Sequence, residues 1–149
     1  MIKRLNNKNI MNIFEFISRV QDRYKEFYIT KSKDRIYINN LNLIKKIIKS
    51  QTIHGLFDSD LKGLIILYKE KGYRIYLKIL SENIEITKNL IKFIIWNYCN
   101  QDLYIKLKKS NPLVRTMQQY GWVFRGNRGT EILLCRPKSF KTQYRSKEK

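Results

Sequence analysis

The chain has 149 residues, of which 43% are hydrophobic, and a formal net charge of +19. This length is typical of a single domain, and the apolar and aromatic content is far above that of a disordered polypeptide. Charged residues interrupt every apolar stretch, which excludes a membrane-spanning helix of about 20 apolar residues.

The first third of the chain predicts a short strand and two helices. Residues 2–5 have the composition of a strand. Apolar side chains then recur every three or four residues from position 10 to 27, which predicts an amphipathic helix that Asn7 or Asn9 caps. A second helix is expected over residues 41–50.

The middle of the chain predicts three antiparallel strands over residues 53–80. Short turns at residues 58–60 and 71–72 separate these strands, and such short connections favour an antiparallel meander. The unbroken apolar run 64–67 indicates a strand that is covered on both faces.

The next predicted element is a helix that begins near Ile84. Ser81 or Asn83 is its expected cap, and the carboxylates of Glu82 and Glu85 suit its positive N-terminal end. An alternating strand follows over residues 102–108.

The last predicted elements are a short helix and a hairpin. Asn111 is the expected N-cap of the helix, and Pro112 is its expected first residue. Gly121 is expected to end the helix in a left-handed conformation. The hairpin is expected to turn across residues 126–129, and residues 138–149 have the composition of a basic tail.

The order of these elements and two local patterns resemble the GNAT family of N-acetyltransferases. Residues 56–67 are similar to the family's central hairpin, and residues 111–137 are similar to its closing helix, glycine–aromatic pair and final strand. The first 50 residues resemble the family by element order alone. The resemblance implies an α+β fold: a central, mostly antiparallel mixed sheet of about six or seven strands with about four flanking helices. It also implies one domain over residues 1–137.

GNAT enzymes bind acetyl-CoA through a Gln/Arg-x-x-Gly-x-Gly/Ala loop between a strand and a helix. Glycine lets the backbone N–H groups approach the diphosphate. In this chain that position reads Leu80, Ser81, Glu82 and Asn83, without glycine, and Glu82 and Glu85 repel an anion there. We therefore expect no cofactor, with acetyl-CoA bound through a divergent loop as the alternative.

The family's usual general acid is a tyrosine four residues before the glycine–aromatic pair. That position holds Met117, which has no proton to donate. Tyr120 is the proton carrier only if the chain is an acyltransferase, and no other catalytic residue is expected.

Positive charge is concentrated at the two ends of the chain. Residues 1–50 carry 12 basic and 4 acidic side chains, residues 51–100 carry 7 and 5, and residues 101–149 carry 12 and 3. This distribution favours an anionic partner, either nucleic acid or an acidic protein surface within a larger assembly. The expected anion-binding residues are Lys106, Lys108, Lys109, Arg115, Arg125, Arg128, Lys138, Lys141 and Arg145.

Two alternatives remain open for these basic residues. Residues 125–129 either form a nest of N–H groups for phosphate or an ordinary hairpin turn. The lysines of the preceding strand either belong to a basic binding face or protect a solvated strand edge.

The chain has one histidine, His54, and two cysteines, Cys99 and Cys135, in no metal-binding spacing. We therefore expect no metal site, a structural role for His54 and a reducing compartment.

These observations together favour a non-catalytic, basic GNAT-like module, such as a structural component of a phage particle or another nucleoprotein assembly. Its expected location is the cytoplasm or a virion. The alternatives are an acyl-CoA-dependent N-acetyltransferase and a nucleic-acid-binding protein.

Overall fold

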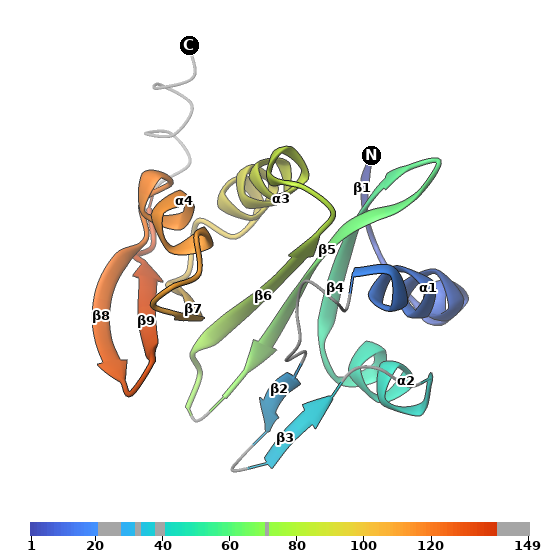
Figure 1. Cartoon of the computed structure of the whole chain (residues 1–149), viewed down its shortest axis with the longest axis horizontal. Helices are drawn as coiled ribbons and strands as arrows, with labels where there is room; N and C mark the ends of the chain where they lie inside the picture. Colours follow the sequence, from blue (N-terminus) through green and yellow to red (C-terminus); the bar gives the residue numbers. More distant parts are fainter. Residues whose placement is uncertain (21–27, 32–33, 38–40, 71, 140–149) are drawn as a thin grey trace.

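A computed structural model of the chain describes residues 1–20, 28–31, 34–37, 41–70 and 72–139. Within these residues, seven strands form one mixed sheet and two more form a separate antiparallel hairpin (Figure 1). In spatial order, the strands of the sheet are β1 (Ile2–Arg4), β4 (Thr52–Asp58), β5 (Asp60–Lys69), β6 (Ile75–Ser81), β7 (Leu103–Lys108), β9 (Glu131–Arg136) and β8 (Val123–Arg128). The hairpin consists of β2 (Tyr28–Lys31) and β3 (Asp34–Tyr37).

Four α-helices of the described residues cover the two faces of the sheet (Figure 1). They are α1 (Ile10–Val20), α2 (Leu41–Ser50), α3 (Ile84–Asn97) and α4 (Leu113–Gln119). The mostly antiparallel mixed sheet with four helices confirms the predicted α+β architecture. In the described part of the chain, no helix is long and apolar enough to cross a membrane.

The first helix is capped one residue earlier than the sequence predicts. Asn6 accepts a hydrogen bond from the Lys8 backbone N–H at 2.8 Å, and its own N–H donates to the Asn9 side chain at 3.1 Å. This reciprocal box closes a 3-10 turn (Asn7–Asn9) that leads into α1. Asn9 thus takes part in the box, but it is not the cap. The predicted continuation of the helix to residue 27 lies outside the described residues.

Strand β5 separates two hydrophobic cores. Leu64 and Ile66 face the core of α1 and α2, whereas Ile65 and Leu67 face the core of α3 and α4. Each of these four side chains is at most 6% exposed. The prediction that the apolar run 64–67 is covered on both faces is therefore confirmed, and alternation with period two accounts for it.

The middle strands form the predicted meander, and a parallel crossover follows it. β4 pairs antiparallel with β5, and β5 pairs antiparallel with β6. α3 then carries the chain to β7, which pairs parallel with β6. This parallel ladder joins Ile75–Leu77 only to Leu103–Ile105, although β6 continues to Ser81 and β7 to Lys108. The two strands therefore part towards their C-terminal ends (Figure 1).

The C-terminal helix agrees with the prediction in part: Gly121 ends it, but Leu113 is its first residue and Pro112, predicted at that position, precedes it as the cap. The Asn111 side chain accepts a hydrogen bond from the Leu113 backbone N–H at 2.9 Å, and Gly121 is left-handed with φ 98°. The hairpin that follows differs from the prediction, because β8 runs through Arg128 and pairs this residue with Glu131. The turn therefore lies at residues 129–130, and residues 125–128 belong to a strand. Of the two alternatives for residues 125–129, the strand pairing of residues 126–128 agrees with an ordinary hairpin.

Candidate functional site

The junction of β6 and α3 is the position where the sequence predicts a cofactor loop. Leu80 is buried in the core of α1 and α2, and Ser81 is 3% exposed. Ser81 donates a hydrogen bond to the Asn83 carbonyl oxygen at 2.9 Å and is also hydrogen-bonded to Thr87. Asn83 caps α3 by accepting from the Ile86 backbone N–H at 3.0 Å. The junction is therefore held in one conformation by its own polar side chains, without glycine.

Glu82 belongs to an ion cluster that connects the junction to α1 and β5. Its carboxylate lies 2.9 Å from Arg19 Nη2 and 3.7 Å from Lys62 Nζ. The same two cations lie 3.7 and 3.2 Å from the carboxylate of Asp60, and the hydrogen bond from Lys62 lowers the pKa of Asp60. Two cations thus balance two anions. The charge of Glu82 is compensated on the side of α1, and the argument that Glu82 repels a diphosphate at the N-terminus of α3 loses its basis.

The N-terminus of α3 keeps the capacity to bind an anion. The first N–H groups of a helix have no intrahelical acceptor, and the Asn83 cap takes only that of Ile86. The backbone N–H groups of Ile84 and Glu85 are therefore available to a ligand. The Glu85 carboxylate, 79% exposed, lies 3.9 Å from Lys88 Nζ, so solvent and a cation both screen it.

A row of three tyrosines crosses the sheet beside the parallel ladder. Tyr68, Tyr76 and Tyr104 are direct neighbours on β5, β6 and β7, and successive ring centroids lie 5.7 and 5.5 Å apart. Tyr68 and Tyr76 belong to the core of α1 and α2, so the row lies on that face of the sheet. Lys106 Nζ lies 5.0 Å from the Tyr76 ring centroid, and the Arg74 guanidinium lies 4.8 Å from that of Tyr104.

Glu70 is the residue of this cluster that the sequence analysis missed. Its Oε2 lies 2.6 Å from Lys106 Nζ, whereas its Oε1 is buried and has no hydrogen-bond partner among the described residues. The side chain is only 13% exposed. A buried carboxylate oxygen without a donor is costly, which makes this atom a candidate ligand-binding group. No sequence signal pointed to Glu70, because its partner Lys106 lies 36 positions away.

The predicted basic residues are dispersed. Lys106 lies on the tyrosine face, whereas Arg115 belongs to α4, which packs on the opposite face, so these two residues do not share one basic surface. The exposed residues of the set are Lys108, Lys109, Arg115, Arg125, Arg128 and Lys138. Lys141 and Arg145 lie outside the described residues. In the described part of the chain, no three His, Cys, Asp or Glu side chains are grouped as metal ligands would be.

His54 is buried and lies between β4 and α3. Its Nε2 lies 2.8 Å from the Tyr98 hydroxyl, and its ring centroid lies 4.8 Å from that of Phe93. Burial, and secondarily the charge of Arg4, lower the pKa of His54 below its ordinary value. The ring therefore stays neutral in the folded protein near pH 7.

This shift predicts that acid destabilises the protein below about pH 6.5, the ordinary pKa of the unfolded histidine. Because the folded pKa is lowered, the unfolded chain binds the proton more tightly, and stability falls as the pH falls. Between pH 7.5 and 5.5, the free energy of unfolding should decrease by up to about 1.4 kcal/mol. Urea unfolding at the two pH values measures this change. Since His54 is the single histidine, the variant His54→Phe should lose the dependence, and an unchanged dependence in that variant would assign it to other groups.

Several solved structures that share this fold are N-acetyltransferases. The N-acetyltransferase from Staphylococcus aureus Mu50 is 20% identical, with a TM-score of 0.71, over 92% of this chain and 96% of that chain. The ribosomal-protein-S5-alanine acetyltransferase from Vibrio fischeri is 8% identical, with a TM-score of 0.69, over 93% and 92% of the two chains. A mutant form of the spermidine N-acetyltransferase SpeG from Vibrio cholerae is 12% identical, with a TM-score of 0.65, over 100% and 99%. No family model matches the sequence, and no curated protein matches it significantly.

The chain therefore has a GNAT-like fold, as its motifs predict. The prediction of a non-catalytic structural or binding module is wrong, because the proteins that share the fold are acetyltransferases. The prediction failed because it treated the missing glycines and the charge of Glu82 as decisive. The acyltransferase alternative agrees better with these neighbours.

Proposed function

We propose that the chain is an acyl-CoA-dependent N-acyltransferase that binds acetyl-CoA through a divergent loop at the β6–α3 junction. One observation carries the proposal: the GNAT-like fold spans nearly the whole chain and includes the parting of β6 and β7 beside the N-terminus of α3. Because fold by itself does not define an activity, the residues of the junction support the proposal beside the fold.

The residues at the junction fit acetyl-CoA. The N–H groups of Ile84 and Glu85 suit a diphosphate, and the ion cluster of Arg19, Lys62 and Asp60 compensates the charge of Glu82. The pantetheine arm of the molecule carries two amides, which suit the backbone of strands that part. When bound, acetyl-CoA supplies an activated acyl group.

Glu70 is proposed to bind the acceptor amine. Among the described residues its Oε1 has no hydrogen-bond partner and can accept a hydrogen bond from an ammonium group, while Lys106 holds Oε2 in place. Tyr120, half-buried at the end of α4, packs against the core of α3 and α4, on the other face of the sheet from the tyrosine row. It is proposed to donate a proton to the leaving sulfur where β6 and β7 part, after the neutral form of the amine has attacked the thioester carbonyl.

Two measurements on the purified chain test this function. Calorimetric titration with acetyl-CoA should show saturable binding with a micromolar Kd. Incubation with acetyl-CoA and a panel of polyamines, amino acids and peptides should yield an N-acetylated product that mass spectrometry detects. The variant Tyr120→Phe should lower kcat without changing the Kd of acetyl-CoA. Absence of both binding and product would refute the proposal.

A further inference from the structure

The hairpin of β5 and β6 places two side chains of opposite charge beside the tyrosine row. Glu70 follows the last residue of β5, and Arg74 precedes the first residue of β6. Lys69 pairs with Ile75, so positions 70 and 74 are the next to face each other across the hairpin. Each stands two positions from a tyrosine of the row, and with a period of two both side chains leave the face on which that row lies.

Arg74 is an exposed cation that uncharged groups hold in place. Its guanidinium lies 4.8 Å from the Tyr104 ring centroid. A hydrogen bond with the Tyr76 side chain is the largest effect that raises the pKa of Arg74, and no carboxylate of the described residues is among the groups that act on this pKa. Because a guanidinium has five N–H donors in a planar fork, enough of them remain for a ligand carboxylate.

Glu70 supplies the complementary group. Its Oε2 is held by Lys106 at 2.6 Å, whereas Oε1 has no hydrogen-bond partner among the described residues. An ionised carboxylate only accepts hydrogen bonds, so Oε1 lacks a donor, and an ammonium group is the donor that matches its charge. The hairpin therefore combines an acceptor for an ammonium group with a donor for a carboxylate.

The charge of the cluster of Glu70, Lys106 and Arg74 disfavours a polycationic acceptor. Lys106 already balances Glu70, Arg74 adds one positive charge, and the whole chain carries +19. A second ammonium group on the acceptor meets this positive field without a second carboxylate in the cluster. A zwitterion adds no net charge and places its own carboxylate where the cluster is positive.

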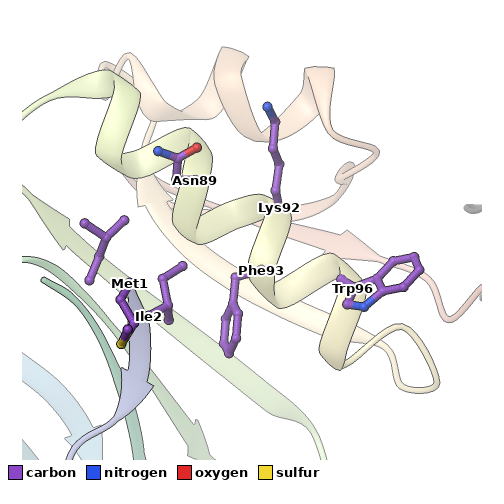
Figure 2. A pocket seen from close by; sticks show the side chains of 7 residues that line it. Met1, Ile2, Asn89, Lys92, Phe93 and Trp96 are labelled. Carbon is purple, nitrogen blue, oxygen red and sulfur yellow. The ribbon is translucent and has the colours of Figure 1, made fainter. Parts of the chain in front are cut away.

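The hollow on the other face of the sheet is of a different kind. It lies between β1, β4 and α3, and Lys92 points away from Ile2 and Phe93 (Figure 2). Ile2 and Phe93 pack on the core of α3 and α4, whereas Tyr68 and Tyr76 belong to the core of α1 and α2. The side chains that match both charges of a zwitterion thus lie on the tyrosine face.

We propose that the acceptor is a free amino acid, whose ammonium group donates to Glu70 Oε1 while its carboxylate accepts from the Arg74 guanidinium. This inference names the substrate class of the proposed acyltransferase and rests on that function.

Glycine, β-alanine and 4-aminobutyrate are the probes, since they present the same two charges at increasing separation. Calorimetric titration, with and without saturating coenzyme A, should show that at least one of them binds saturably. Butylamine and 1,4-diaminobutane carry a methyl or an aminomethyl group in place of the carboxylate of 4-aminobutyrate. Both should bind at least about fivefold more weakly than the best amino acid, the upper range of a partly exposed ion pair.

Two variants separate the hairpin cluster from general charge effects. Arg74→Gln should raise the Kd of the best amino acid to that of butylamine and leave the Kd of butylamine unchanged. Arg115→Gln removes the same charge from an exposed position of α4, on the other face of the sheet, and should bind the amino acid as the natural chain does. Circular dichroism checks that both variants are folded.

The proposal is overturned if no amino acid of the three binds saturably, or if butylamine or 1,4-diaminobutane binds as tightly. Equal effects of Arg74→Gln and Arg115→Gln also overturn it. Mass spectrometry of the products separates this result from the fate of the proposed function. If acetyl-CoA binds and a polyamine but no amino acid is acetylated, the assignment of the acceptor fails and the acyltransferase stands. If an amino acid binds through Arg74 but acetyl-CoA does not bind, the amino-acid site stands and the acyltransferase fails.

Discussion

Replacement of Glu70 by glutamine is expected to lower kcat/KM for the acceptor amine by about 10- to 100-fold. The reason is the loss of a hydrogen bond between a buried carboxylate and an ammonium group, which contributes about 1.5–3 kcal/mol, where about 1.4 kcal/mol corresponds to a tenfold change. Glutamine keeps the size of the side chain and an oxygen for Lys106. Steady-state kinetics with the best acceptor of the panel measures the effect.

The division between KM and kcat identifies the role of Glu70. If Glu70 binds the amine equally in the ground state and the transition state, KM rises and kcat stays the same. The Kd of acetyl-CoA should not change, whether Glu70→Gln alters KM or kcat. Glu15→Gln, which removes an exposed carboxylate of α1, is the matched control and should retain wild-type kinetics. An unchanged kcat/KM in Glu70→Gln would remove Glu70 from the acceptor site while leaving the transferase proposal intact.

Gly63→Val is expected to destabilise the protein by about 3 kcal/mol, because the space above this residue is filled. A Cβ atom at Gly63 would lie 2.6 Å from Ile86 Cγ2, 3.0 Å from Leu90 Cδ1 and 3.3 Å from the Leu80 carbonyl oxygen. Ile86 belongs to the first turn of α3, so the added methyl groups push the N-terminus of this helix away from the sheet. The free energy of unfolding, measured with urea, should fall accordingly, and acetyl-CoA binding should weaken with it.

Gly126→Val is the matched control for this change. A Cβ atom at Gly126 has no neighbour within 4 Å, and this residue has no positive φ that would strain a side chain. The control should therefore unfold within about 0.5 kcal/mol of the natural chain, as surface substitutions usually do. Equal stability of the two variants would mean that α3 moves at little cost and that Gly63 does not fix its N-terminus.

Capping residues, turn residues and hydrophobic periodicity predicted many of the elements, because each of these signals acts within a few residues. The structure agrees with three such predictions: Asn83 caps α3, Asn111 and Gly121 flank α4, and the apolar run of β5 is buried on both faces. The exceptions arose where neighbouring residues offered similar local signals. Asn6 is the cap, where Asn7 or Asn9 was predicted. The pairing of β8 with β9 extends through residues 126–128, so the turn lies further along the chain than predicted.

The site depended on contacts that no local signal encodes. Glu82 meets Arg19 from 63 positions away, Glu70 meets Lys106 from 36, and His54 meets Tyr98 from 44. The sequence specified the α+β class and the order of the elements, since hydrophobic periodicity and capping are short-range properties. Tertiary packing of distant segments decided which carboxylates are compensated and where β6 and β7 part. The reason is that the energy of a charge depends on the partners and the solvent around it, and folding alone supplies both.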